Sequence, residues 1–502
     1  MKLQALVLFL VANLLSSSSV AQQPGATAVA AVDEIPQRPE QLRFPPLTFE
    51  VPDPTQFRRM LNNGIPIYIA EDRALPLVSI QILFRGGRYL EPEGKEGLAP
   101  LTGRVWRTGG AGEWDAETLD EELDFLAANL SVNVGDTNSS VSLNLLAKDL
   151  DTGLKILMDV LFKPRFQESR LERAREDLLA AMQRRNDSTA GIESREWDRL
   201  VYGPDYWMNR LPTRASVTSI NRQDLVDFHR RLANTGEMVL AVSGDFDKEE
   251  MLAKLDSTLG QIPPTGEKLP EVPQPSHQPE PGVYVVNKPD VNQGRVSIGH
   301  LGLKRPVEDE FELRLANDIL GGSGFTSRIL SRVRSDQGLA YSAGSSYGIL
   351  NTIPGTFQAF FQSKSSTVPA AANLVVELIR ELQTDGVTSS ELDTAKNSMI
   401  ETFPNYFQST FATVSLYARD ELLGLPHDYW MNYRDRVRSA TMEAVQESAR
   451  RHIRPDQLVV LVVGNMDEIM KGDPDYPNAR LENLGPVTHL PLRDPMTLEP
   501  LE

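Results

Sequence analysis

The chain has 502 residues, of which 40% are hydrophobic and 24% charged, and its formal net charge is −18. This length and composition are typical of a soluble globular protein with roughly two to four domains. The acidic balance argues against nucleic acid or an anionic membrane as the main partner. The sequence contains no cysteine, which excludes disulfides, thiol catalysis and cysteine-ligated metal sites.

Residues 1–21 have the pattern of a secretory signal peptide. Lys2 precedes a short apolar run over Leu3–Leu15, and small residues follow up to Ala21. A membrane anchor is the alternative, but the run is short for a bilayer span. We therefore predict cleavage after Ala21, a disordered segment over residues 22–44, and secretion across the inner membrane. The absence of cysteine favours a Gram-negative periplasm, and no later segment predicts a membrane span.

A first globular domain is predicted over residues 45–261, where strand and helix patterns alternate. Alternating or continuous apolar residues predict strands, and apolar residues spaced three and four apart predict helices. Gly97–Trp106 has a helical pattern although Pro100 lies inside it. The predicted strands are Ile67–Ala70, Leu77–Phe84, two within Leu130–Leu146, and Met238–Ser243; the predicted helices are Ala116–Asn129, Asp149–Leu161, Glu168–Arg185 and Arg222–Leu232.

A proline-rich linker is predicted over residues 262–282, and a second domain that repeats the first over residues 283–485. Seven prolines in the linker predict a semi-rigid, extended segment. Ser219–Asp247 aligns with Ser439–Asp467 without a gap, at a constant offset of 220 residues. Residues 486–502 are predicted to be an extended tail. The pattern thus predicts an α+β protein, a tandem duplication of an α/β domain whose mainly antiparallel sheet is packed by helices.

The stretch Gly321–Tyr341, GGSGFTSRILSRVRSDQGLAY, combines a glycine-rich start with a cation and a phenol. A short helical pattern follows the glycines, Gly338 ends it, and Leu339–Tyr347 predicts a strand. Glycines beside a helix start leave backbone amides free to bind oxyanions or peptide carbonyls. Arg334 and Tyr341 converge across the turn as two hydrogen-bond donors. The alternative is a simple connector with a surface arginine and a half-buried tyrosine.

Other catalytic motifs are absent or weak in this sequence. The glycines at 321–324 are not a P-loop, because no Gly-Lys-Ser/Thr follows, and their spacing does not fit a dinucleotide fingerprint. No two of the six histidines are three or four residues apart, so no local pair of metal ligands exists. A Ser–His–Asp triad stays open on spacing alone, although no nucleophile-elbow sequence supports it.

The duplicated layout and the stretch GLAPLTGR, residues 97–104, resemble the insulinase/pitrilysin family of zinc metallopeptidases. In that family the first of two α/β roll domains carries an inverted zinc motif, H-x-x-E-H, after a Gly-Leu-Ala lead-in. Here Pro100 and Arg104 stand where the two zinc histidines would be, and Gly103 stands where the catalytic glutamate would be. Ala181 is the nearest match to the third ligand. The resemblance therefore implies a degenerate zinc motif and no metal in this chain.

The second half of the family's site is present. VRSDQGLAY resembles the segment that supplies an arginine and a tyrosine seven residues apart, which here are Arg334 and Tyr341. The loop GGSGF resembles the family's substrate-binding loop and gives Gly321, Gly322, Gly324 and Phe325 as candidate substrate-binding residues. In the family's two-chain members, one subunit holds zinc and the other brings the Arg/Tyr pair.

The resemblance implies the non-zinc-binding subunit of a heterodimeric zinc metallopeptidase, half of a clam shell that encloses peptide substrates. Zinc is then expected in a homologous H-x-x-E-H partner, and this chain is expected to be inactive alone. Its part would be to bind substrate and to stabilise the transition state of peptide hydrolysis. The alternative is a catalytically inactive structural or peptide-binding homologue of the same fold.

Overall fold

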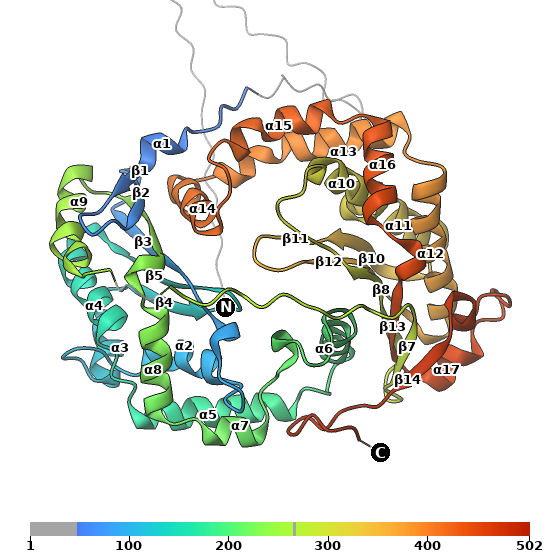
Figure 1. Cartoon of the computed structure of the whole chain (residues 1–502), viewed down its shortest axis with the longest axis horizontal. Helices are drawn as coiled ribbons and strands as arrows, with labels where there is room; N and C mark the ends of the chain where they lie inside the picture. The colour runs from blue at the N-terminus through green and yellow to red at the C-terminus, as the bar shows by residue number, and fades with distance from the viewer. Residues whose placement is uncertain (1–47, 265–267, 502) are drawn as a thin grey trace, which may run out of the picture. The chain divides into compact units, whose positions relative to one another are not determined.

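Two six-stranded sheets, one from each half of the chain, form the framework of the fold (Figure 1). The computed structural model describes residues 48–264 and 268–501. The predicted signal peptide, residues 1–21, and the predicted disordered segment, residues 22–44, lie outside the described residues. The two sheets with their helices confirm the predicted α+β fold with two repeated halves.

The first sheet is mixed and has the strand order β1-β2-β6-β3-β5-β4. β2 runs parallel to β6, and the other neighbouring strands are antiparallel. Every residue of β6 is buried because this nearly continuous apolar strand lies inside the sheet, whereas β3 alternates between buried and half-buried residues. The strands are β1 (Arg58–Met60), β2 (Pro66–Glu71), β3 (Leu77–Arg85), β4 (Asn129–Val134), β5 (Asn138–Leu146) and β6 (Met238–Gly244).

The second sheet repeats this arrangement in the order β10-β12-β8-β13-β7-β14. Five strands correspond in position to β4, β5, β3, β6 and β2 of the first sheet, and β10 is therefore an edge strand like β4. A small parallel pair, β9 with β11, lies outside this sheet. The strands are β7 (Gly282–Asn287), β8 (Gln293–Leu301), β9 (Leu303–Lys304), β10 (Ala340–Tyr347), β11 (Ile349–Leu350), β12 (Thr356–Lys364), β13 (Val459–Gly464) and β14 (Val487–Leu490).

The helices of the first half include one, α2, that contains a proline. Pro100 lies in the first turn of α2, where a missing N–H costs no intrahelical hydrogen bond. Trp106 then anchors α2, because its fully buried indole donates to the Val160 carbonyl at 2.7 Å. The helices are α1 (Pro54–Phe57), α2 (Leu98–Thr108), α3 (Ala116–Phe125), α4 (Leu150–Phe162), α5 (Glu168–Gln183), α6 (Thr189–Tyr202), α7 (Arg214–Ser219), α8 (Arg222–Leu232) and α9 (Lys248–Ser257).

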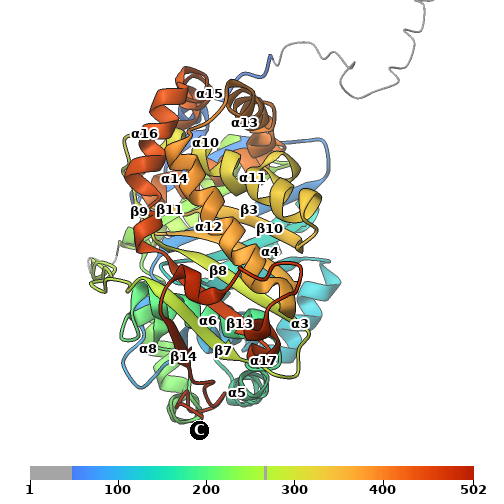
Figure 2. The ribbon, with the colours of Figure 1, turned by 90° about the vertical axis from the view of Figure 1, so that its right-hand side faces the viewer.

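Among the helices of the second half, α12 packs against β8 and β12 of the second sheet (Figure 2). Two short π-helices, η7 (Asp318–Gly322) and η9 (Ser331–Asp336), interrupt the regular α-helical geometry before β10. The α-helices are α10 (Glu310–Asn317), α11 (Arg328–Leu330), α12 (Val368–Thr384), α13 (Ser389–Glu401), α14 (Thr410–Leu423), α15 (Tyr429–Ser439), α16 (Met442–His452) and α17 (Met466–Lys471).

Helix α3 ends four residues earlier than the apolar pattern predicts. Ala127 adopts a left-handed conformation with φ of 47°, and its amide donates to the Asp124 carbonyl at 3.0 Å. The next amide, of Ala128, donates to the Leu123 carbonyl at 2.9 Å. These two bonds form a Schellman C-cap, which usually has glycine at the left-handed position. The helix end was missed because alanine carries no such sequence signal.

The two halves exchange helices that occupy equivalent places in the repeat. Helix α14 of the second half packs against β2, β3 and β6, and α6 of the first half packs against β8 and β13 (Figure 1). Glu421 on α14 accepts hydrogen bonds from Arg58 at 2.7 and 2.8 Å and from the Tyr68 hydroxyl at 2.7 Å. Because each sheet is covered partly by the other half, residues from Phe49 onward form one compact unit.

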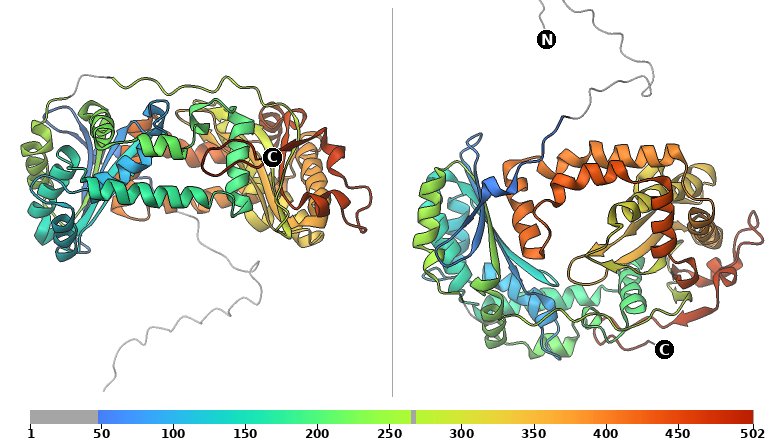
Figure 3. Two further views of the ribbon diagram at one scale, coloured as in Figure 1. Left: turned by 90° about the horizontal axis from the view of Figure 1, so that it is seen from below. Right: turned by 45° about the horizontal axis from the view of Figure 1, so that its top comes forward.

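The proline-rich linker runs as an extended segment from the first half to the second (Figure 3). Residues 268–281 contain no helix or strand. The hydroxyl of Tyr89 donates to the Pro270 carbonyl at 3.1 Å, and the hydroxyl of Tyr206 donates to the Pro273 carbonyl at 2.8 Å. Proline restricts the backbone to extended conformations, and these hydrogen bonds hold the extended segment in place.

Residues 486–501, predicted to be an extended tail, include a strand of the second sheet. Strand β14 pairs in parallel with β7 and completes the second sheet. The chain then contacts the first half, where the Arg493 carbonyl accepts from the Asn186 side chain at 2.7 Å, and the Met496 carbonyl accepts from the Arg214 amide at 2.8 Å. The segment therefore links the second sheet to the helices of the first half. Among the helices that the structure describes, none has the length and apolar character needed to cross a bilayer.

Candidate functional site

The glycine-rich loop joins the end of one helix to the start of the next. Gly321 and Gly322 lie in the π-helix η7, which continues α10, so the expectation that they stand beside a helix start is wrong. A Cβ at Gly321 would lie 2.4 Å from the Ser345 amide nitrogen on β10, and one at Gly322 would lie 2.6 Å from a carboxylate oxygen of Asp318. Close packing against the strand therefore requires glycine at 321, and the predicted contact of both glycines with substrate stays a prediction.

Gly324 and Phe325 form the exposed tip of this loop. Gly324 has a left-handed conformation with φ of 64°, and a Cβ there would point into open space. The ring of Phe325 is 66% exposed, which is unusual for a large apolar side chain. The loop thus presents an aromatic ring to the surroundings of β10.

The segment after the loop, which carries Arg334, is anchored by buried apolar side chains. Ile329, Leu330 and Val333 are buried, as the short helical pattern predicts. The helix is not regular, however, because η9 has π geometry, which is often found at functional sites. Arg328 fixes this segment to α13 through two hydrogen bonds to Glu391 of 2.6 and 2.8 Å.

Arg334 and Tyr341 lie together, as their spacing predicts. The guanidinium carbon of Arg334 is 4.5 Å from the centroid of the Tyr341 ring and 4.9 Å from that of Phe325. Tyr341 is 80% exposed, so the alternative of a half-buried tyrosine is not what the fold provides. Neither the guanidinium nor the phenol hydroxyl has a hydrogen bond or ion pair with any residue of 48–264 or 268–501. Both side chains therefore retain free donors.

Tyr341 is also the second residue of an unpaired strand edge. Among the strands that the structure describes, β10 pairs with β12 alone, and the register shifts between Ala340 and Ser342, where the strand bulges. Farther along, the Asn317 side chain donates to the Ser345 carbonyl at 3.4 Å. The start of β10 is thus the part of this edge that an extended peptide can join by backbone pairing.

The positions that match the zinc motif lie on α2 and have no ligand chemistry. Pro100 and Arg104 are exposed, whereas Gly103 is buried, and a Cβ there would lie 3.1 Å from Val134 on β4. Arg104 forms an ion pair with Asp177 of α5. Ala181 is exposed one helical turn beyond Asp177. The fold therefore brings α2 and α5 together as a zinc site requires, but an arginine–aspartate pair connects them.

These residues do not fit a zinc ion. Proline, glycine and alanine side chains offer no lone pair, and the guanidinium of Arg104 is a donor that repels a cation. No group of three or more histidine, aspartate or glutamate side chains that could hold a metal occurs in the part of the chain that the structure describes. Asp177, which sequence reasoning missed, stands four residues before Ala181 and so on the same helix face.

Glu91 holds the start of α2. Its carboxylate accepts from the amide of Gly97 at 3.1 Å and from that of Ala99 at 2.6 Å, which satisfies two of the free amides at this helix end. Burial raises the pKa of Glu91 to about 7, although both hydrogen bonds oppose the shift. The carboxyl group is therefore costly to ionise in the native protein.

Replacing Glu91 with glutamine is expected to change how stability depends on pH. The pKa of Glu91 in the folded state, about 7, lies above its ordinary value of 4.5, so the native state binds more protons than the unfolded chain between these pH values. Stability therefore falls as the pH rises through that window. Glutamine keeps the acceptor without the charge. The variant should gain about 3 kcal/mol relative to wild type between pH 4.5 and pH 8 in urea denaturation. Glu93→Gln, at an exposed neighbour, should give a curve parallel to wild type; a parallel curve for Glu91→Gln would contradict the assignment.

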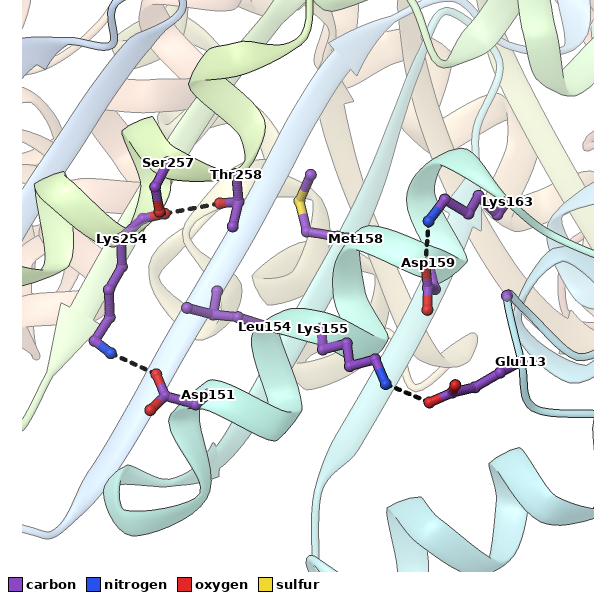
Figure 4. A pocket seen from close by; sticks show the side chains of 11 residues that line it. Glu113, Asp151, Leu154, Lys155, Met158, Asp159, Lys163, Lys254, Ser257 and Thr258 are labelled. Atoms are coloured by element: carbon purple, nitrogen blue, oxygen red, sulfur yellow. Dashed lines mark hydrogen bonds and ion pairs between the residues drawn. The ribbon is translucent and has the colours of Figure 1, made fainter.

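A separate open pocket of about 960 Å³ lies on the first half, between α4 and α9 (Figure 4). Its floor includes the apolar side chains of Leu154 and Met158. Its charged side chains are already paired with one another, so the lining offers no unpaired cation or anion to a ligand. The pairs are Lys254 with Asp151, Lys155 with Glu113, and Lys163 with Asp159.

Two family models match the chain. The one described as "Insulinase (Peptidase family M16)" matches residues 67–195, and the one described as "Peptidase M16 inactive domain" matches residues 219–399. Together the two matches cover more than half of the chain. The first match contains the degenerate motif on α2, and the second contains Arg334 and Tyr341.

Relatives and solved structures agree with this match. The chain is 24% identical over 403 residues to "Non-peptidase homolog YmxG" of Helicobacter pylori, covering 80% of this chain and 92% of that protein. It is 23% identical over 419 residues to "Uncharacterized zinc protease YmxG" of Bacillus subtilis, covering 82% and 99%. The crystal structure of a peptidase M16 inactive domain from Pseudomonas fluorescens has the same fold, with a TM-score of 0.73 and 23% identity over 81% of this chain and 97% of that chain. The chain therefore belongs to the insulinase family of peptidases, M16.

Proposed function

We propose that this chain is the zinc-free subunit of a two-chain zinc peptidase. The observation that carries the proposal is the Arg334–Tyr341 pair, whose donors remain free beside an unpaired strand edge. Of the positions that match the zinc motif, Arg104 forms an ion pair with Asp177, and Pro100, Gly103 and Ala181 offer no ligand atom. A chain with donors for a transition state but no place for the metal needs a homologous H-x-x-E-H partner that holds zinc.

The proposed chemistry of this chain is substrate binding and stabilisation of negative charge. Peptide hydrolysis forms a tetrahedral intermediate with a developing oxyanion, which donors positioned in advance stabilise. The exposed phenol of Tyr341 is proposed to donate to this oxygen, and Arg334 to bind the substrate next to it. An extended peptide paired with the start of β10 would lie beside both. Backbone pairing does not depend strongly on sequence, so broad peptide specificity is expected.

A second candidate function is a catalytically inactive homologue that binds peptides or has a structural role. The name of the Helicobacter pylori relative, "Non-peptidase homolog YmxG", favours it. A purely structural role gives no reason for two free donors at an open strand edge, so the geometry supports the first candidate better. Both candidates are placed in the periplasm by the proposed signal peptide.

Reconstitution tests the proposal. The purified chain should hydrolyse no fluorogenic peptide, with or without added zinc, and mixing with a homologous H-x-x-E-H chain should restore hydrolysis that a chelator abolishes. The matched control is the same partner with the glutamate of its motif changed to glutamine, which should stay inactive in the mixture. Chelator-sensitive cleavage by the chain alone would overturn the proposal. Full activity of the partner without this chain would favour the second candidate.

A further inference from the structure

We propose that Arg334 binds the terminal carboxylate of a peptide that pairs, as an antiparallel strand, with the start of β10. This inference rests on the peptide-binding part of the proposed function and adds the class of ligand. It concerns peptides with a free C-terminus, which the chain should bind without its partner.

The surroundings of Arg334 favour a planar anion. Its guanidinium lies over the rings of Phe325 and Tyr341, at 4.9 and 4.5 Å, so aromatic surface restricts its orientation. The N–H groups at the edge of the guanidinium plane remain without an acceptor among the described residues. A guanidinium fork held in this way matches the two oxygens of a carboxylate better than the single oxygen of a peptide carbonyl.

The charge of Arg334 is also uncompensated. Within η9, Arg332 pairs with Asp336 at 3.9 Å, which leaves Arg334 as the cation of this helix without an anion partner. Although the whole chain has a formal net charge of −18, no carboxylate of the described residues forms an ion pair with Arg334. A ligand carboxylate would supply the missing charge at a partly desolvated position, where charge-assisted hydrogen bonds are strong.

The direction of the strand selects the end of the peptide. Tyr341 is the second residue of β10, so the stack with Arg334 lies at the beginning of this edge strand. A strand that joins β10 in antiparallel orientation has its own C-terminal end at that beginning. The Asn317 side chain occupies the Ser345 carbonyl farther along, which confines pairing to the first residues of β10. A bound peptide would therefore end at Arg334.

Fluorescence anisotropy with the full chain tests this inference. Three labelled decapeptides are compared. Two share one sequence of Ala, Ser, Thr and Val, with a free C-terminus in one and an amidated C-terminus in the other; the third is the amidated peptide with its last residue replaced by glutamate. The free peptide should bind about tenfold or more tightly than the amidated one, as expected for a charge-assisted pair. The third peptide separates the two sources of a carboxylate, since tight binding by it alone would assign a side-chain carboxylate and overturn the proposal.

Substitutions of Arg334 and of the nearby Arg332 test whether Arg334 causes the preference for a free C-terminus. Arg334→Gln should remove the preference for the free C-terminus, and Arg334→Lys should reduce it, because lysine keeps the charge without the planar fork. Arg332→Gln is the matched control on the same helix and should keep the preference. Equal binding of free and amidated peptides would overturn this inference alone. Binding of no peptide at all would overturn it together with the peptide-binding part of the proposed function.

Discussion

In the reconstituted pair, Tyr341→Phe should lower kcat by roughly a hundred- to thousand-fold and leave KM almost unchanged. The reason is that a donor aimed at the developing oxyanion acts in the transition state more than in the bound substrate. Phenylalanine keeps the ring that stacks on Arg334 at 4.5 Å and removes only the hydroxyl. Steady-state kinetics with a fluorogenic peptide measure both constants.

Two further variants separate the effect of the Tyr341 hydroxyl from that of its ring and from the loss of a phenol elsewhere. Tyr406→Phe removes another partly exposed phenol of the second half, 41% exposed on a different segment, and should leave kcat unchanged. Tyr341→Ala removes both the hydroxyl and the ring, so it should also raise KM if the stack orients Arg334 for substrate. Wild-type kcat in Tyr341→Phe would exclude a catalytic role for this side chain.

The framework of the fold could be predicted from the sequence because its signals are local. The apolar run over Met238–Ser243 became the buried strand β6, and its repeat at a constant offset became β13, at the same place in the second sheet. In residues 268–281 the proline-rich segment has no helix or strand. Each of these features depends on residues that are neighbours in sequence.

The exchanged helices show what local patterns miss. No helix was predicted over Thr189–Tyr202, yet α6 covers part of the second sheet. Its buried side includes Glu193, Arg195 and Glu196, which a pattern analysis assigns to solvent. Glu193 is satisfied by Arg295 and Ser297, which are more than a hundred residues away. Glu196 pairs with the distant Arg493 as well as with its neighbour Arg195. Such pairing leaves no periodic trace in the sequence.

In the candidate site, too, local sequence patterns predict some features and miss those that depend on distant residues. The seven-residue spacing of Arg334 and Tyr341 predicts that they converge, because a short helix, a glycine turn and a strand are local structures. The pairing of Arg104 with Asp177 joins two helices that are 73 residues apart, and no sequence pattern specifies it. The position of Gly321 also differs from the expected one beside a helix start, since it lies in η7 and its close contact with Ser345 depends on how η7 packs on β10.

Replacing Glu193 with alanine is expected to lower the free energy of unfolding by about 3 kcal/mol. Glu193 is 5% exposed, accepts from the Ser297 hydroxyl at 2.7 Å, and pairs with Arg295 on β8 of the other half. The variant leaves Arg295 without its ion pair and Ser297 without its acceptor at the contact between α6 and the second sheet. Chemical denaturation followed by circular dichroism measures the loss.

The comparison with a surface carboxylate decides whether burial is the cause. Glu172 also pairs with an arginine, Arg175, but its side chain is 52% exposed, so Glu172→Ala should cost less than about 1 kcal/mol. Equal losses in the two variants would contradict the assignment. Glu193 joins α6 to the second sheet, but it is only one of the contacts of the exchanged helices. If the exchanged helices as a whole make the two halves unfold together, Glu193→Ala should still unfold in one transition, with the m-value of wild type. Two separate transitions in Glu193→Ala would mean that the two halves unfold together only because of the contact that Glu193 makes with the second sheet.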